Sequence, residues 1–415
     1  MSRGELAPGE QLPPVRRLAT ALTVSPATVA AAYKALGQRG VVVANGRRGT
    51  AIAPEPPLRA QRPRSLPAGV LDLARGNPDP ALLPPLAPVL ARIDPEHKLY
   101  GGPANLEALV AHARSAFAAD GVGGEIVIAG GALDGIERVL QTRLRPGDAV
   151  AVEDPSWPRI RDLVHALGLV PEPVALDEHG FLPAALERAL RRAKAVITTP
   201  RGQNPTGAAL DDERARRLRD LLARHPDVLV VEDDYAAGVA GVPYQPLHGS
   251  TRHWAVVRSL SKVLGPDLRI ALVAGDPLTV CRVEGRLLVG AGWVSHLLQQ
   301  TAAQLLGDAG TQKLIAHAAR TYRERREALL AALSEYGLRA SGRSGLGVWI
   351  PVAEEAATAE LLLEAGFAVS AGERYRFRAS PAIRVTTTTL EPAEARQLAA
   401  ALAGIARPGS ATYTG

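Results

Sequence analysis

Apolar strand-like runs alternate with helical segments beyond about residue 70, and this alternation restricts the fold more than any other feature. The runs are "EIVIAGG", "DAVAVED", "AVITTP", "VLVVEDDY" and "HWAVVRSLS", and helix-like stretches such as 133–144 and 208–224 lie between them. The pattern predicts an α/β layer with a mainly parallel sheet. The stretch 312–406 mixes a long helix, strands and a final helix, so we expect a smaller α+β subdomain there.

Length, hydropathy and cysteine content exclude several classes of protein. A chain of 415 residues with 47% hydrophobic residues can form two or three globular domains. No apolar run is long enough to span a bilayer, and "MSRGELAPGEQLPPVRR" lacks the apolar centre of a signal peptide, so we expect a cytoplasmic protein without a membrane partner. Cys281 is the single cysteine, which excludes an intrachain disulfide and a thiolate metal cluster. We expect no metal site.

The positive charge is concentrated at the amino terminus. Residues 1–70 contain ten Lys and Arg against three Asp and Glu, a net charge of +7, whereas the whole chain carries +6. The remaining residues therefore carry a net charge of −1. Such a distribution is typical of a small module that contacts a polyanion while the rest of the chain does not.

The sequence of this basic segment predicts a winged helix-turn-helix. Apolar residues at helical spacing in 15–22 indicate one helix, and Ser25 followed by Pro26 opens a second after a short turn. "VVVA" and "TAIA" then flank the basic tip "NGRRG", which is typical of a β-hairpin wing. In this arrangement the second helix enters the major groove and the wing neutralises phosphates. The residues expected to contact DNA are Ser25, Ala27, Thr28, Lys34, Arg47 and Arg48.

The segment "LAPGEQLPPVRRLATALTVSPATVAAAYKALGQRGVV" resembles the DNA-binding domain of the GntR family of bacterial regulators. That family places a further helix ahead of the "G-x-L-x-P-G" stretch, and this chain begins almost at it, so the resemblance implies that about one helix of the module is absent. The predicted domains are residues 1–53 for the DNA-binding module, 54–70 for a proline- and arginine-rich linker, 71–406 for the larger domain and 407–415 for a frayed tail.

Lys262, in "RSLSKVLGPDLR", is one of only five lysines in a chain rich in arginine. A guanidinium is always protonated and cannot provide the amine of a Schiff base, so a retained lysine indicates chemistry. An incidental surface lysine is the alternative.

Residues near Lys262 and at the ends of the predicted strands would suit one ligand. Gly130 and Gly131 precede a helix and offer N–H groups to a phosphate, and Trp157 can stack on a flat ring. Asn204 lies in a rigid turn and can hydrogen-bond a ligand, and "EDDY" supplies three adjacent carboxylates, at least one of which needs a cationic partner. Ser259 and Arg269 add phosphate ligands. Together they predict a pocket for pyridoxal 5′-phosphate.

From about residue 71 to 406 the chain resembles a class I aminotransferase of fold type I, whose mainly parallel sheet is of the seven-stranded type. The matching motifs are "YGGPANLEALVAHA", "DPSW", "PRGQNPTG", "EDDY", "SLSKVLGPDLR" and "PAIRV". The resemblance implies that Lys262 is the Schiff-base lysine, that Asp233 pairs with the pyridine nitrogen, and that Arg384 binds the substrate's carboxylate. It further implies that Asn204 and Tyr235 bond the ring hydroxyl and Trp157 stacks on the ring. The implied phosphate ligands are Gly131, Ala132, Ser259 and Arg269, with Tyr100 from a second subunit. The choice of Asp233 over Asp234 depends on register alone.

A GntR-like module joined to an aminotransferase-like domain is similar to the MocR branch of GntR regulators. The resemblance implies a homodimer that binds DNA and senses pyridoxal 5′-phosphate, an amino compound, or the adduct of the two. The alternative is a working class I aminotransferase, moving an amino group from an amino acid to a 2-oxo acid, with a vestigial DNA-binding module. Lys262, Asp233 and Arg384 would serve both functions equally.

Overall fold

The computed structural model describes residues 9–38, 42–44, 49–52, 66–93 and 98–406. Arg47 and Arg48 lie outside the described residues, and so does the side chain of Lys34.

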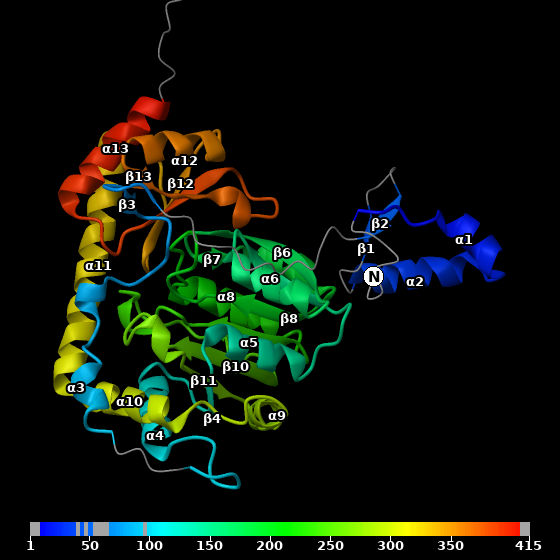
Figure 1. Cartoon of the computed structure of the whole chain (residues 1–415), viewed down its shortest axis with the longest axis horizontal. Helices are drawn as coiled ribbons and strands as arrows, with labels where there is room; N and C mark the ends of the chain where they lie inside the picture. The colour runs from blue at the N-terminus through cyan, green and yellow to red at the C-terminus, as the bar shows by residue number, and fades with distance from the viewer. Residues whose placement is uncertain (1–8, 39–41, 45–48, 53–65, 94–97, 407–415) are drawn as a thin grey trace, which may run out of the picture.

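The described residues of the amino-terminal module form two helices and a two-stranded sheet (Figure 1). Helices α1 (Val15–Leu22) and α2 (Pro26–Gln38) are joined by a turn in which Thr23 adopts a left-handed backbone conformation. The Ser25 hydroxyl accepts the N–H of Thr28 at 3.1 Å, so Ser25 caps α2 as its sequence suggests. Strands β1 (Val42–Ala44) and β2 (Thr50–Ile52) pair antiparallel. The described elements are those of a winged helix-turn-helix.

An eight-stranded sheet forms the centre of the larger domain, with strand order β4-β11-β10-β9-β8-β5-β6-β7. Strands β5, β6, β8, β9 and β10 run parallel, and β11 pairs antiparallel with both of its neighbours. The sequence predicted a seven-stranded sheet, and the additional strand is the two-residue β7 at one edge. The strands are β4 (Glu125–Ala129), β5 (Ala149–Asp154), β6 (Val170–Asp177), β7 (Gly180–Phe181), β8 (Ala193–Thr198), β9 (Leu229–Asp233), β10 (His253–Ser259) and β11 (Ala271–Gly275).

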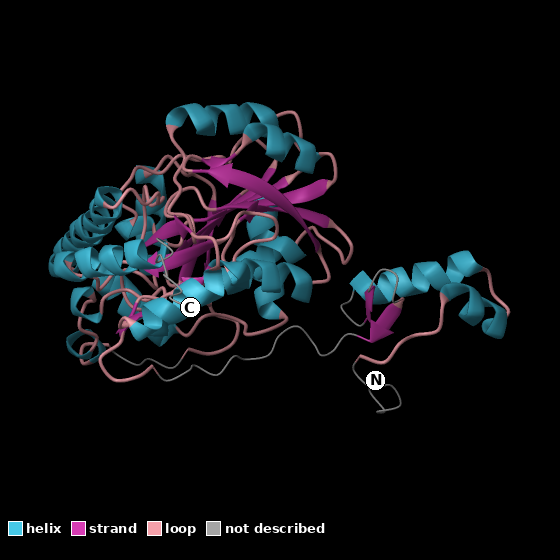
Figure 2. Ribbon diagram, turned by 90° about the horizontal axis from the view of Figure 1, so that it is seen from above, coloured by secondary structure: helices cyan, strands magenta, loops and turns pink. Residues whose placement is uncertain are grey.

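Helices cover both faces of this sheet (Figure 2). On β4, Val127 packs on the side of α5 and α9, while Ile126 and Ile128 pack on the side of α4 and α10. Both faces are buried, which is why the strands are continuous apolar runs rather than alternating ones. The covering helices are α4 (Glu107–Ala119), α5 (Ala132–Gln141), α6 (Pro158–Ala166), α7 (Pro183–Leu190), α8 (Asp212–Leu222), α9 (Pro277–Leu288) and α10 (His296–Gly307). We call the part of the chain built on this sheet the large lobe.

A second, smaller layer, the small lobe, is built on the three-stranded sheet β12-β15-β14. Its helices are α11 (Ala309–Glu335), α12 (Glu355–Glu364) and α13 (Pro392–Ala406), and its sheet strands are β12 (Gly347–Pro351), β14 (Ser370–Ala371) and β15 (Ala382–Thr386). β13 (Phe367–Ala368) pairs parallel with β3 (Leu71–Asp72), which joins residues almost 300 positions apart. A short helix, α3 (Ala87–Leu90), lies earlier in the chain. The long helix, strands and final helix agree with the α+β subdomain expected from the sequence.

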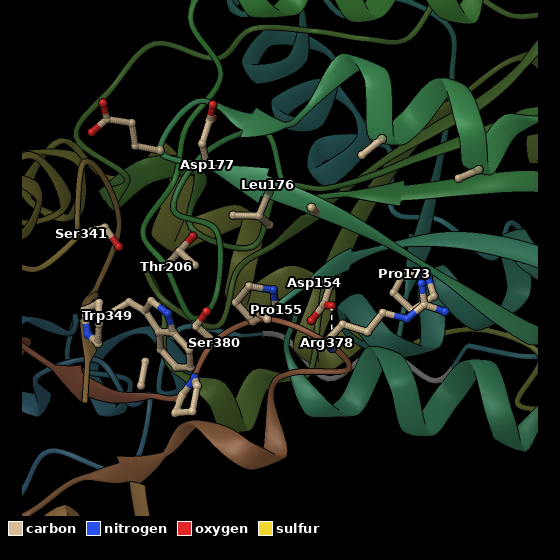
Figure 3. Close-up of a pocket in the computed structure, with 18 of the residues that line it drawn as sticks. Asp154, Pro155, Pro173, Leu176, Asp177, Thr206, Ser341, Trp349, Arg378 and Ser380 are labelled. Carbon is tan, nitrogen blue, oxygen red and sulfur yellow. Dashed lines mark hydrogen bonds between the residues drawn. The ribbon is translucent and has the colours of Figure 1, made fainter. Parts of the chain in front are cut away.

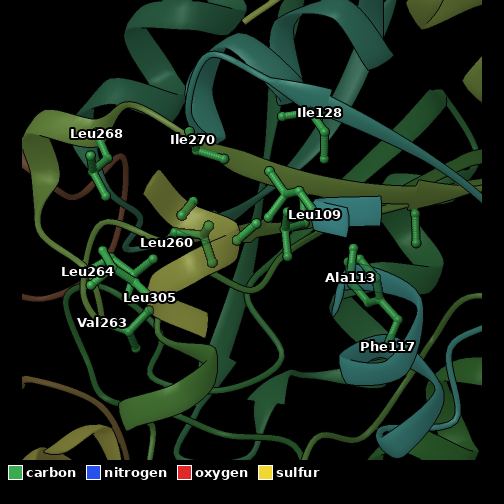
Figure 4. Close-up of a cluster of buried hydrophobic side chains, with 14 of the residues drawn as sticks. Leu109, Ala113, Phe117, Ile128, Leu260, Val263, Leu264, Leu268, Ile270 and Leu305 are labelled. Atoms are coloured by element: carbon green, nitrogen blue, oxygen red, sulfur yellow. The ribbon is translucent and has the colours of Figure 1, made fainter. Parts of the chain in front are cut away.

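One apolar cluster fixes the loop that contains Lys262. Leu260, Val263, Leu264 and Leu268 are buried against residues of α4, β4 and α10, including Phe117 (Figure 4). These four side chains hold the loop on one side. Within the described residues, no helix has the length and apolar character that crossing a bilayer requires.

Candidate cofactor and ligand site

A cavity of about 500 Å³ lies where the carboxyl ends of several large-lobe strands meet the small lobe. This is the position at which α/β sheets of this type bind ligands. Most of the residues predicted from the sequence line it. They are Ala132, Trp157, Asn204, Asp233, Tyr235, Ser259, Lys262, Arg269 and Arg384.

Lys262 reaches this cavity because its neighbours in the loop are buried in the opposite direction. Its ammonium donates to the backbone oxygen of Gly76. Burial, together with the nearby charge of Arg384, lowers the pKa of the Lys262 amine to about 8, although Asp233 partly opposes the change. A fraction of the amine is therefore neutral, and nucleophilic, near neutral pH.

Arg269 and the turn before α5 form a cationic corner of the cavity. Arg269 has a left-handed backbone, with φ of 49°, which is uncommon for a residue with a side chain. Its guanidinium packs on Gly131, where a Cβ atom would lie 2.4 Å from Nη2, and the φ of 107° at Gly131 is a conformation that favours glycine. Ser259 and Ser261 share a hydrogen bond of 2.8 Å beside it. The helix amino terminus, a guanidinium and hydroxyl groups together suit a phosphate.

The three adjacent carboxylates that end β9 have three different environments. Glu232 accepts hydrogen bonds from Tyr244 and from the N–H groups of Leu247 and His248. Asp234 accepts hydrogen bonds from the guanidiniums of two buried arginines, Arg201 and Arg258, each with an Nε to oxygen distance of 2.8 Å. Asp233 lines the cavity instead, and its Oδ1 is buried without a hydrogen-bond partner among the described residues.

Of the three carboxylates, Asp233 is therefore the one that faces the cavity with an oxygen unpartnered by the described residues. Burial and the neighbouring charges of Glu153 and Asp234 raise the pKa of its carboxyl to about 8. A buried acid without a partner is costly, and a protonated ring nitrogen would supply the missing donor and positive charge.

Asn204, Tyr235 and Trp157 complete the cavity wall on the large-lobe side. Asn204 Oδ1 is a second buried oxygen that has no partner in the described part of the chain. Tyr235 donates its hydroxyl hydrogen to the Gly202 oxygen at 2.6 Å, which leaves the hydroxyl oxygen as an acceptor. Two orphaned oxygens, a stacking ring, a cationic corner and a primary amine fit pyridoxal 5′-phosphate.

Arg384, on β15, lies on the small-lobe side of the cavity. It is only 4% exposed, and its one hydrogen bond within the described residues is to the Ala74 oxygen at 3.3 Å. A buried guanidinium with so little compensation is suited to binding a ligand carboxylate.

Sequence reasoning missed several residues that line the cavity. Arg374 and Tyr375 enter the cavity from the small lobe, and "GERYRF" carries no signal that could have identified them. Glu153 was also missed. Its carboxylate accepts hydrogen bonds from Thr199 and Gln203, on the turn that leads to Asn204, and burial raises its pKa to about 7. Gly131 contacts Arg269 but is not among the lining residues.

Tyr100 is the one predicted cofactor ligand that lies away from the cavity. It is 93% exposed, and its ring lies 5.5 Å from that of Trp293. The single chain does not bring it to the site, so a contact from a second subunit stays a prediction. In the amino-terminal module, Ser25, Ala27 and Thr28 are exposed at the start of α2, as a DNA-facing surface requires.

Comparison with known proteins identifies both parts of the chain. Residues 1–52 match the family of bacterial regulatory proteins of the gntR type, and residues 69–402 match aminotransferase class I and II. The vitamin B6 salvage pathway transcriptional repressor PtsJ of Salmonella typhimurium is 42% identical over 402 residues, covering 96% of this chain and 94% of that protein. The chain belongs to the MocR branch of the GntR family.

Other relatives agree with this assignment. The HTH-type pyridoxine biosynthesis transcriptional regulator PdxR of Corynebacterium glutamicum is 29% identical over 81% of this chain and 76% of its own length. Among solved structures, a kynurenine aminotransferase from Pyrococcus horikoshii has a TM-score of 0.74 at 22% identity, covering 81% of this chain and 90% of its own. This likeness shows the fold type I architecture of the MocR chain. Pyridoxal 5′-phosphate is its cofactor.

Proposed function

We propose that this MocR protein is a transcriptional regulator whose DNA binding responds to pyridoxal 5′-phosphate and to an amino compound in the cavity between the lobes. The observation that carries the proposal is that one chain combines two features. The start of its second helix is exposed, as DNA binding requires. Its cavity contains a lysine with a pKa of about 8, an acid without a partner among the described residues, and a buried arginine. PtsJ and PdxR, by their names, regulate vitamin B6 salvage and pyridoxine biosynthesis. We extend this to the present chain as a proposal about its target genes.

The proposed roles of the residues follow from their positions. When bound, the cofactor supplies an aldehyde that a primary amine can attack and a protonated ring that withdraws electrons. Lys262 Nζ provides the amine, and Asp233 holds a proton at the ring nitrogen. Asn204 and Tyr235 orient the ring from the side of its hydroxyl group, and Trp157 excludes water from one face. Arg384 binds the carboxylate of an amino compound.

The phosphate of the cofactor would lie in the cationic corner formed by Arg269, Ser259, Ala132 and the Gly131 turn. The phosphate turn has no hydroxyl residue in "GGAL", so backbone N–H groups replace that contact.

We further propose a homodimer located in the cytoplasm. Leu99 and Tyr100 are 79% and 93% exposed, and exposed apolar residues of this size favour an interface. In that dimer Tyr100 would reach the cofactor of the partner subunit.

The amino-terminal module is proposed to bind DNA through Ser25, Ala27, Thr28 and Lys34 on α2 and through Arg47 and Arg48 in the wing. The first three are exposed. Ser25 has a second role as the cap of α2, so its hydroxyl is already an acceptor for Thr28.

The test compares DNA binding and amino-group transfer in the same preparation. We expect salt-dependent binding to DNA from the regions upstream of vitamin B6 salvage or pyridoxine biosynthesis genes, and slow or absent transfer to a panel of 2-oxo acids. Lys262→Ala should abolish the visible absorbance of the lysine-bound cofactor and the response of DNA binding to it. Rapid transfer without salt-dependent DNA binding would favour the aminotransferase instead, since Lys262, Asp233 and Arg384 suit both reactions.

A further inference from the structure

A second cavity, of about 580 Å³, lies between the large and small lobes and is separate from the cofactor cavity. We call it the interlobe cavity. Strand β6 and helix α7 form its large-lobe side, and β12 with the loop before β15 forms its small-lobe side. Figure 3 shows Trp349, Ser341 and Ser380 on one side, and Arg378 extending from Asp154 toward Pro173. None of these residues has a role in the function proposed above.

The two cavities share walls. Three short segments each place one residue in the interlobe cavity and another, two positions away, in the cofactor cavity. The pairs, with the interlobe residue first, are Pro155 and Trp157, Thr206 and Asn204, and Ala382 and Arg384. Only one residue separates the two members of each pair, so a shift of the backbone at one cavity is transmitted to the other.

Hydrogen bonds between the lobes fix this shared wall. Asp154 accepts the N–H groups of Phe377 and Arg378, each at 2.8 Å, and the N–H of Ser156 donates to the Tyr375 oxygen at 2.8 Å. Tyr375 lines the cofactor cavity, whereas Asp154 and Arg378 line the interlobe cavity. A molecule bound in the interlobe cavity therefore contacts both sides of the junction that sets the distance between the lobes.

The carboxylates that line the interlobe cavity already have partners. Asp154 accepts the two backbone N–H groups described above, and Asp177 forms an ion pair with Arg214 at 2.8 Å. Glu172 lies 3.9 Å from Arg192, and Glu178 lies 3.5 Å from the ring of His179.

The donors of the interlobe cavity, in contrast, are available. Within the described residues, no hydrogen bond or ion pair engages the guanidiniums of Arg188 and Arg378, the hydroxyls of Ser341 and Ser380, or the indole N–H of Trp349. The remaining wall is apolar, formed by prolines, alanines and the Trp349 ring. Arg188, Arg378 and Ser380 are exposed to solvent, so their donors are free to turn toward a ligand, and donors beside an apolar wall suit a ligand with an apolar body and an anionic group.

We propose that the interlobe cavity binds a small organic acid with a flat apolar body, and that its occupancy changes the affinity of the cofactor cavity for amino compounds. The acid's carboxylate pairs with Arg378, and its apolar body packs against Trp349 and the prolines. The proposal goes beyond the function proposed above and does not depend on DNA binding.

The first test measures binding of indole-3-acetate to the cofactor-loaded protein by titration calorimetry. This probe has a carboxylate and a flat ring but no amine, so it cannot react with the cofactor. We expect saturable binding that Arg378→Gln weakens about tenfold, the loss of one charge-assisted hydrogen bond, and that Arg384→Gln leaves unchanged. Neutral indole should bind more weakly than the acid, and inorganic phosphate should not compete.

The opposite pattern, with binding lost in Arg384→Gln and kept in Arg378→Gln, would place the acid in the cofactor cavity and overturn the proposal. Absence of binding to the wild-type protein would overturn it too, and competition by phosphate would identify a site for any anion and overturn the claim for an organic acid.

A second test blocks the interlobe cavity and measures whether its occupancy changes the affinity of the cofactor cavity for an amino compound. Ala379→Trp fills the space from a loop, and retention of the cofactor's visible absorbance reports that the variant is folded. We expect loss of indole-3-acetate binding in this variant. In the wild type, saturating acid should change the affinity for L-alanine, followed through the cofactor spectrum, by about fivefold or more. An affinity for L-alanine that is unaffected by the acid would contradict the coupling, whatever the DNA-binding experiments give.

Discussion

Individual carboxylates next to one another in the sequence have opposite functions here. Asp234 holds two buried arginines, Arg201 and Arg258, whereas Asp233 has an oxygen without a partner among the described residues. Asp234 therefore stabilises the protein. Asp233 lowers the stability of the cofactor-free protein, and its free oxygen is the one that the cofactor binds. The sequence could identify the "EDD" triplet but not this division, because the partners come from β8, β10 and their loops.

This difference predicts contrasting effects of two conservative substitutions. Asp234→Asn should lower the free energy of unfolding of the cofactor-free protein by about 3 kcal/mol, since Arg201 and Arg258 would keep two buried charges with Asp120 as their one remaining acid among the described residues. Asp233→Asn should leave that free energy unchanged or raise it, yet weaken cofactor retention. Chemical denaturation and cofactor content measure the two effects. A destabilised Asp233→Asn variant with normal cofactor content would contradict the assignment.

The pKa of the Lys262 amine predicts how the rate of cofactor uptake depends on pH. Because burial and Arg384 lower its pKa to about 8, the neutral amine increases as the pH rises through about 8. The rate at which cofactor-free protein takes up pyridoxal 5′-phosphate should rise over the same range. Arg384→Gln removes a neighbouring positive charge, which raises the pKa of Lys262 and moves the midpoint upward.

Stopped-flow absorbance across a series of buffers measures this midpoint. Arg269→Gln is the matched control, because it removes a cation from the cavity without being among the groups that shift Lys262. It should slow uptake while leaving the midpoint in place. An equal shift in both variants would mean that the midpoint does not report Lys262.

At the scale of the elements, the predicted strands are those with continuous apolar runs, namely four interior strands and β4 at one edge of the sheet, whereas the interior strand β11 was not among them. β5, β8, β9 and β10 were identified because both of their faces are buried. β6 was not identified because Pro171 and Pro173 interrupt it, and its outer neighbour is only the two-residue β7, so it tolerates prolines as an edge strand does. Small-lobe contributions such as Arg374 depend on contacts distant in sequence, which no local pattern encodes.

The wing is the element whose prediction depends most on charge. Arg47 and Arg48 lie outside the described residues, and their proposed role is to neutralise phosphates. Replacing both with Gln should weaken binding equally at all DNA sequences and reduce the slope of log affinity against log salt by about 1.8, since each lost contact with duplex DNA contributes about 0.9. Fluorescence anisotropy over a range of salt concentrations measures the slope. Arg339 is an exposed arginine of the larger domain, and Arg339→Gln is the control that should change neither the DNA affinity nor the slope. Loss of affinity at one DNA sequence only would indicate that Arg47 and Arg48 contact bases instead.

At the scale of the whole molecule, regulation requires that the cofactor bind differently to two states of the protein, because a ligand that binds both equally shifts neither. Asp154 binds the backbone of Phe377 and Arg378 at the junction of the two lobes. A change at this junction would alter the cofactor cavity, so two arrangements of the lobes would bind the cofactor with different affinities. Coupling between two sites is reciprocal by thermodynamic necessity. If pyridoxal 5′-phosphate changes the affinity for DNA by some factor, DNA must change the affinity for pyridoxal 5′-phosphate by that same factor.

We expect this factor to lie between about 5 and 150, the usual range for coupled sites. Anisotropy of labelled DNA with and without cofactor gives one value, and absorbance titration of the cofactor with and without DNA gives the other. Lys262→Ala should retain basal DNA affinity and bring both values close to one, because the DNA-binding module is intact while the link to the cofactor is lost. Two unequal values in the wild type would show that a third equilibrium, such as dimer formation, contributes. Equal values of one would show that the two parts of the chain bind their ligands independently, which would refute ligand-controlled DNA binding.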